Sequence, residues 1–242
     1  MSLVVPSGRG IELTADGRRL VADARSIIES FDALAARRPR PAATLRIASY
    51  EPWSTWFLPP VLAATGIERA DLVELVPGDL EDALGASRID LAVTAHPVPQ
   101  REVAYERVAR VRTVEVTAAR IRSSARDAAH LPWVAPFDST AGTINARAGL
   151  DGWPEARARD VAFRVTMLET ALALCRSGAA RALLPEPLVA RHNELVRASE
   201  RLEVRRSRPA LPTLDLHLAH RADAPLDSAA LDLLGELRAV FG

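Results

Sequence analysis

The chain has 242 residues, 48% of them hydrophobic, and its 31 basic residues, all arginine, balance 31 acidic residues to a formal net charge of zero. This length suits two lobes of ordinary domain size, and the zero net charge argues against a broad nucleic-acid-binding surface. No apolar run is long enough to cross a bilayer, no secretory signal is visible, and the single cysteine, Cys175, cannot form an internal disulfide, so we expect a soluble, cytoplasmic protein.

The first predicted element is a long helix that begins near Thr14 and ends near residue 38. The Thr14 hydroxyl suits an N-cap, because it can accept a backbone N–H of the first turn. Apolar residues then recur at steps of four and three, the spacing of a coiled-coil seam, and this seam consists of Leu20, Ala24, Ile27, Phe31 and Leu34. The same spacing fits a helix that packs on its own domain. Prolines at positions 39 and 41 end the helix and stiffen a short spacer, which favours pairing with a second chain.

The remaining sequence repeats one order of elements, strand, helix, strand, helix and strand, which is typical of parallel sheets. In the first copy we expect strands at 45–49, 72–76 and 89–94 and helices at 53–65 and 80–87. In the second copy we expect strands at 133–136, 161–165 and 182–184 and helices at 139–148 and 167–177. Long strands at 103–117 and 214–220 are expected to connect the copies, and a helix at 228–241 to pack back on the first. The predicted class is therefore α/β, with two Rossmann-like lobes joined by two crossing strands.

Two segments resemble the LysR-type family of transcriptional regulators. Residues 8–17, GRGIELTADG, resemble the end of a DNA-binding wing and the start of the linker helix in that family. Residues 178–190 resemble the Gly-rich turn, buried strand and proline-led helix of its second lobe. The resemblance covers essentially the whole chain and implies a type 2 periplasmic-binding-protein-like fold preceded by a long linker helix. In the family a winged helix-turn-helix domain precedes these residues, so we expect either a fragment or the product of a short gene.

The resemblance also implies how the chain is divided. We expect a wing remnant at 1–13, a linker and dimerisation helix at 14–38, lobe I at 43–112 together with 214–242, and lobe II at 113–213. Arg9, Arg18 and Arg19 lie beside the expected wing, where they are candidates for contacts with DNA phosphates.

Candidate site residues follow the predicted strands. In parallel sheets of this kind ligands bind beyond the carboxyl ends of the strands, where helix N-termini expose unpaired N–H groups. The residues at these ends are Ser49, Tyr50, Glu51, Thr94, His96, Phe137, Ser139 and Thr166. LysR-type proteins use the same loop positions for their effector, so the resemblance implies that this set contacts a small molecule.

Several candidates also have a purely structural interpretation. Ser139 and Thr166 fit helix N-caps, and Thr166 with Glu169 spells a capping box. His96 fits a solvated loop histidine. Trp53 and Trp56 share one helix face, where core packing is the first interpretation and a wall of the ligand pocket the second.

Glu51 constrains the charge of the ligand. A carboxylate at the mouth of the site would repel a purely anionic ligand unless the carboxylate is paired. Either His96 or an amine of the ligand could be that partner.

The function that we predict is the ligand-sensing and oligomerising part of a LysR-type regulator, with a polar metabolite as effector, a homodimer or homotetramer as the assembly, and DNA as a partner only when a helix-turn-helix is present. We expect no cofactor, no metal and no membrane partner. His217 and His220 lie three apart on a predicted strand and point to opposite faces, and no catalytic motif is found. The alternatives are a solute-binding receptor of the same fold, which has no use for a dimerising helix, and a small-molecule enzyme without a recognisable motif.

Overall fold

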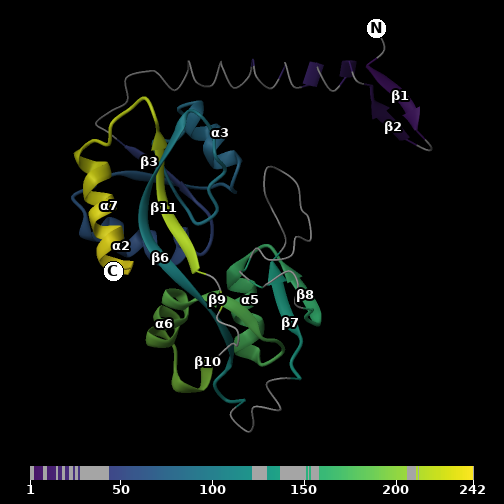
Figure 1. Cartoon of the computed structure of the whole chain (residues 1–242), viewed down its shortest axis with the longest axis vertical. Helices are drawn as coiled ribbons and strands as arrows, with labels where there is room; N and C mark the ends of the chain where they lie inside the picture. Colours follow the sequence, from purple (N-terminus) through teal and green to yellow (C-terminus); the bar gives the residue numbers. More distant parts are fainter. Residues whose placement is uncertain are drawn as a thin grey trace.

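The computed structural model describes residues 3–7, 10–14, 16–17, 20–21, 24, 27, 44–121, 130–136, 151, 153, 158–205, 211 and 213–241. Two lobes follow one another along the long axis of the molecule, and the strands β6 (Val103–Ala118) and β11 (Thr213–Arg221) run side by side between them (Figure 1). We use lobe I for the described residues 44–112 and 222–241, and lobe II for the described residues 113–205. The predicted α/β class with two lobes is confirmed.

Lobe I is built on a central strand, β3 (Leu45–Ser49), which pairs in parallel with β4 (Ala70–Glu74) and β5 (Leu91–Thr94). β5 also pairs antiparallel with β11 (Thr213–Arg221), and β11 pairs antiparallel with β6 (Val103–Ala118). Every residue of β5 is buried, because the sheet is covered on both faces.

Helices cover the two faces of this sheet. A π-helical turn at Trp53–Phe57 runs into α2 (Leu58–Ala64), and this segment packs with α7 (Ser228–Phe241) in one apolar cluster that includes Ile47. α3 (Asp79–Gly85) lies in a second cluster with Ala48. Successive residues of a strand point to opposite faces, so Ile47 and Ala48 assign the two helix layers to the two sides of β3.

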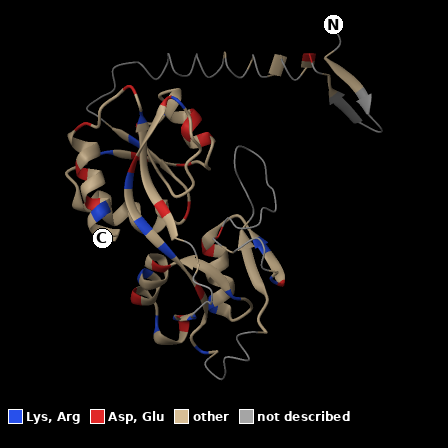
Figure 2. Cartoon of the chain, viewed as in Figure 1, with Lys and Arg blue, Asp and Glu red and all other residues tan. Residues whose placement is uncertain are grey.

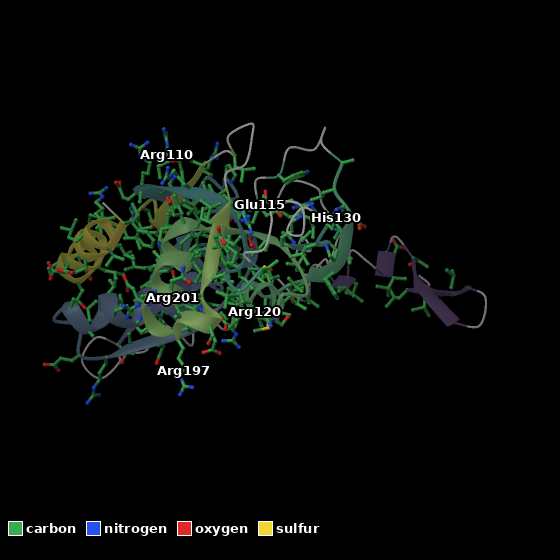
Figure 3. The ribbon with its side chains drawn as sticks, turned by 90° about the horizontal axis from the view of Figure 1, so that it is seen from below. Arg110, Glu115, Arg120, His130, Arg197 and Arg201 are labelled. Atoms are coloured by element: carbon green, nitrogen blue, oxygen red, sulfur yellow. The ribbon has the colours of Figure 1, made fainter. Side chains whose placement is uncertain are left out.

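β6 changes partners where it passes between the lobes. As far as Arg112 it pairs with β11, whereas from Thr113 it pairs with β9 (Ala182–Pro185) and from Glu115 also with β10 (Leu202–Arg205). Its Arg110 side chain is 61% exposed and points outward (Figure 3). Glu115 is 14% exposed and pairs with Arg181.

Lobe II contains the parallel pair β7 (Trp133–Pro136) and β8 (Val161–Val165). The backbone of Arg181, just before β9, hydrogen-bonds Pro132 and Val134 and so attaches this pair to the strands around β6. The helices α5 (Leu168–Ser177) and α6 (Glu186–Leu195) and a 3-10 turn at Ala198–Glu200 complete the described part of the lobe.

The N-terminal region begins with a hairpin of β1 (Val4–Ser7) and β2 (Gly10–Leu13). The Thr14 hydroxyl then accepts the N–H of Gly17 at 3.0 Å, which confirms the predicted N-cap. The described residues of the predicted seam, Leu20, Ala24 and Ile27, are helical and exposed. Phe31 and Leu34 lie outside the described residues, as do Arg9, Arg18 and Arg19.

Some predicted boundaries were wrong. The strand expected at 72–76 occupies Ala70–Glu74, because its register is fixed by pairing Leu45 with Ala70 rather than by its own apolar residues. β10 was not predicted. The helix expected at 139–148 lies outside the described residues. No helix in the described segments is both long and apolar enough to cross a bilayer.

Candidate functional site

A cavity of about 440 Å³ lies between the two lobes. Lobe I contributes the loops after β3, β4 and β5, lobe II contributes β7, β9 and the segment between β8 and α5, and the crossing strands contribute Thr113 and Leu214. The loops after β3 and β5 meet here because parallel strands end at the same edge of a sheet. The cavity volume is within the range of small-molecule sites.

The structure brings together four of the predicted site residues: Tyr50, Glu51, His96 and Thr166 all line the cavity. Ser49 is 1% exposed, and its hydroxyl donates to the carbonyl of Val93 at 2.8 Å within the sheet. Thr94 is fully buried. Both side chains therefore belong to the core of lobe I rather than to the cavity wall. Phe137 and Ser139 lie outside the described residues.

The wall on the lobe I side is held by a chain of hydrogen bonds. The phenolic oxygen of Tyr50 accepts the N–H of Ala95 at 2.9 Å and lies 2.8 Å from Nδ1 of His96, while the N–H of His96 donates to the Thr94 hydroxyl at 3.1 Å. The hydrogen bond from Ala95 and the short distance to Nδ1 hold the Tyr50 hydroxyl against the His96 ring. Burial raises the pKa of Tyr50, which favours the protonated phenol.

Glu51 connects the two lobes. Its Oε1 accepts the N–H of Glu169, in the first turn of α5, at 2.9 Å. The predicted capping box was therefore wrong: Met167 is the N-cap residue of α5 and no side chain of its own turn caps it, so the carboxylate of Glu51 supplies the acceptor from lobe I. A second bond crosses the same boundary, from Nε1 of Trp56 to Oε2 of Glu169 at 3.2 Å.

Two oxygens on the cavity wall have no hydrogen-bond partner among the described residues: Oε2 of Glu51 and Oγ1 of Thr113. Thr113 is 6% exposed and lies where β6 leaves lobe I. Burial raises the pKa of Glu51, and its backbone hydrogen bonds to α5 oppose this effect. Sequence reasoning missed Thr113, because nothing in an alternating strand marks the residue at which its partners change.

The described lining of the cavity is acidic and otherwise mainly apolar. It contains the carboxylates of Glu51, Glu74 and Asp151 and no arginine. Asp151 is compensated, since both of its oxygens bond the guanidinium of Arg159, at 2.6 and 3.1 Å. Neither Glu51 nor Glu74 has an ion-pair partner in the described segments, so the negative charge of the site belongs to them. Sequence reasoning also missed Glu74, because the strand that it ends was expected to extend to residue 76.

Comparisons with known proteins identify relatives of this architecture. The sequence model of the family described as LysR substrate binding domain matches residues 38–242. No curated protein sequence matches the chain. Among solved structures, the probable transcriptional regulator PA0477 from Pseudomonas aeruginosa is similar with a TM-score of 0.64 and 18% identity, covering 98% of this chain and 81% of that one. The reduced OxyR regulatory domain from Pseudomonas aeruginosa has a TM-score of 0.64 and 20% identity, with 82% and 98% covered. Full-length CbnR complexed with its target DNA has a TM-score of 0.58 and 18% identity, with 99% and 84% covered.

Proposed function

Because the chain belongs to the family of LysR substrate-binding domains, the effector-sensing part of transcription regulators, we propose that its interlobe cavity is the effector site and that its N-terminal helix pairs two chains. The effector is a small molecule, and the assembly is a homodimer or homotetramer. The family match favours a transcription regulator over an enzyme or a solute receptor.

The observation that carries this proposal is the hydrogen bond between Glu51 and Glu169, which joins the two lobes beside the cavity. Glu51 lines the cavity from lobe I, and Glu169 directly follows the lining residue Leu168 in lobe II. A molecule that binds beside this bond contacts both lobes at once, so its binding free energy differs between arrangements of the lobes. A ligand with such a preference shifts the population toward one arrangement, which is the requirement for a sensor.

Pairing through the N-terminal helix is supported by exposed apolar residues. Leu20 is 45% exposed, Val21 39% and Ile27 70%. Burying such a stripe against a second helix would remove apolar area from water.

The proposal that the regulator binds DNA is supported only by the similarity of this chain to a structure that contains DNA. The full-length CbnR structure to which this chain is similar contains target DNA. In the described part of this chain, basic and acidic residues are interspersed over both lobes (Figure 2). We therefore place the function of these lobes in sensing, with DNA contacts made by other parts of the regulator.

A cavity-filling variant tests the effector site. Thr166 is an exposed residue of the cavity rim, so Thr166→Trp should obstruct binding while the fold is kept. The matched control is Phe163→Trp on β8, which places the same indole outside the cavity lining. In a thermal-shift screen of amines, organic acids and neutral aromatics, compounds that stabilise the unmodified chain should lose their effect with Thr166→Trp and keep it with Phe163→Trp. Equal shifts with both variants would place the binding site elsewhere.

The pairing helix is tested separately. Replacing Leu20 and Ile27 with Asp should weaken self-association in sedimentation velocity, because buried carboxylates in a seam are unfavourable. An unchanged sedimentation coefficient for the double variant would exclude this helix as the pairing element.

A further inference from the structure

The N-terminus of α5, which could otherwise bind an anion, is already occupied by a carboxylate of the chain itself. α5 has ten residues, and its N-terminus lies at the cavity, where the exposed N–H groups and the helix dipole would attract an anion. The carboxylate of Glu51 takes this position and accepts the N–H of Glu169. An anionic effector would therefore have to displace a carboxylate that belongs to the chain itself.

The unsatisfied groups of the cavity match a hydrogen-bond donor with positive charge. Oε2 of Glu51 is buried and lacks a partner among the described residues, and leaving a buried carboxylate oxygen unpaired is costly. Glu74 adds a second negative charge to the lining. An ammonium group supplies both the missing donor and the compensating charge in one charge-assisted hydrogen bond.

The Thr113 hydroxyl gives a second polar contact point. It lies on the crossing strand β6, its side chain is buried, and its oxygen lacks a partner among the described residues. The described walls between these two polar points are largely apolar, including Trp53, Val134 and Leu183. Such walls favour a hydrocarbon or aromatic body over a ligand that carries several charges.

We propose that the effector is a monocationic amine with an apolar body, of the alkylamine or arylalkylamine class, and that Glu51 is its counter-ion. This inference rests on the proposed function of the cavity and specifies the effector class. The interaction of the amine with Glu51 also couples effector binding to the relative arrangement of the two lobes. An ammonium at Oε2 favours the ionised carboxylate, and an ionised carboxylate accepts the N–H of Glu169 more strongly. Amine binding therefore stabilises the arrangement in which Glu51 bridges to α5.

The test compares compounds that differ only in their charged group. Calorimetric titrations of the full chain at pH 7 would use matched sets, such as phenethylamine, 3-phenylpropionate and 2-phenylethanol, with the corresponding indole and linear alkyl series. In each series whose apolar group fits the cavity, the amine should bind at least about tenfold more tightly than the carboxylate and the alcohol. Glu51→Gln should reduce the preference for amine over alcohol to about twofold or less while the alcohol still binds, since an amide keeps the acceptor for Glu169 but loses the charge.

Glu203→Gln is the matched control variant. Oε2 of Glu203 on β10 is also buried without a hydrogen bond among the described residues, although Nη2 of Arg205 lies 3.8 Å away. Glu203 does not line the cavity, so its amide should leave the amine preference unchanged.

The outcomes separate the two proposals. Tighter binding of carboxylates than of amines would overturn the amine proposal and leave the cavity as the effector site. Retention of the full amine preference in Glu51→Gln would overturn the role of Glu51. If no compound of any charge class binds, the proposed function of the cavity fails and the amine proposal fails with it. The ranking of compounds on the unmodified chain decides the effector class even if Glu51→Gln does not fold.

Discussion

The two walls of the cavity satisfy their polar groups in different ways. On the lobe I side, Tyr50, His96 and the backbone of Ala95 are bonded to one another within the lobe, whatever lobe II does. On the lobe II side, the first turn of α5 takes a cap from Glu51 of lobe I. The lobe I wall is thus preformed, whereas the hydrogen bonding of the lobe II wall depends on the arrangement of the lobes. This asymmetry is what a sensor of lobe arrangement needs.

The largest expected effect tests whether the lobe I wall is part of a rigid core. Trp53 is 2% exposed and its ring lies 5.7 Å from that of Phe57 and 6.0 Å from that of Phe241. Trp53→Ala should lower the free energy of unfolding by about 3–5 kcal/mol through lost burial and a residual cavity. Urea denaturation measures this change, and a loss below about 1 kcal/mol would mean that this wall is not preformed.

A smaller effect, on amide hydrogen exchange, should show directly that the hydrogen bonds of the two walls depend differently on Glu51. Glu51→Ala removes the acceptor of the Glu169 N–H but leaves the Tyr50 bonds in place, so hydrogen exchange should accelerate by about tenfold at Glu169 and remain unchanged at Ala95. Exchange measured by NMR at both amides gives the comparison. Equal acceleration at both positions would contradict the difference between the walls.

The smallest effect concerns pH. Burial raises the pKa of Glu51, so between about pH 4 and that raised value the folded chain binds this proton more tightly than the unfolded chain. The contribution of Glu51 to stability therefore falls as the pH rises through this window and is constant above it. The melting temperature of the unmodified chain, relative to that of Glu51→Gln, should decrease between about pH 4 and pH 7. A constant difference across this range would show that Glu51 is not perturbed by burial.

Local patterns predicted the framework well. β7 and β8 have the predicted bounds because both are short segments rich in apolar residues, and the strand-end rule brought Tyr50, Glu51, His96 and Thr166 to the cavity. The same rule could not separate these residues from Ser49 and Thr94, which are buried in the sheet. Neighbouring residues at a strand end point to opposite sides, and the sequence does not say which side faces the cavity.

What could not be predicted depends on contacts between distant parts of the chain. The cap of α5 comes from a residue 118 positions earlier, so a local capping pattern at Thr166 pointed to the wrong partner. Thr113 acquires its place at the cavity because β6 exchanges β11 for β9 at that residue. Both features are set by how the lobes pack, which no local spacing encodes.

The most direct test that Glu51 binds an amine between the lobes is a crystal structure of the chain with the amine that binds most tightly in the calorimetric series. We expect the compound between the lobes, with its ammonium within hydrogen-bond distance of Oε2 of Glu51 and with the bond from Glu169 to Oε1 intact. A compound bound outside the cavity, or one inside it that displaces Glu51 from α5, would overturn the role of Glu51 as the counter-ion that joins the lobes.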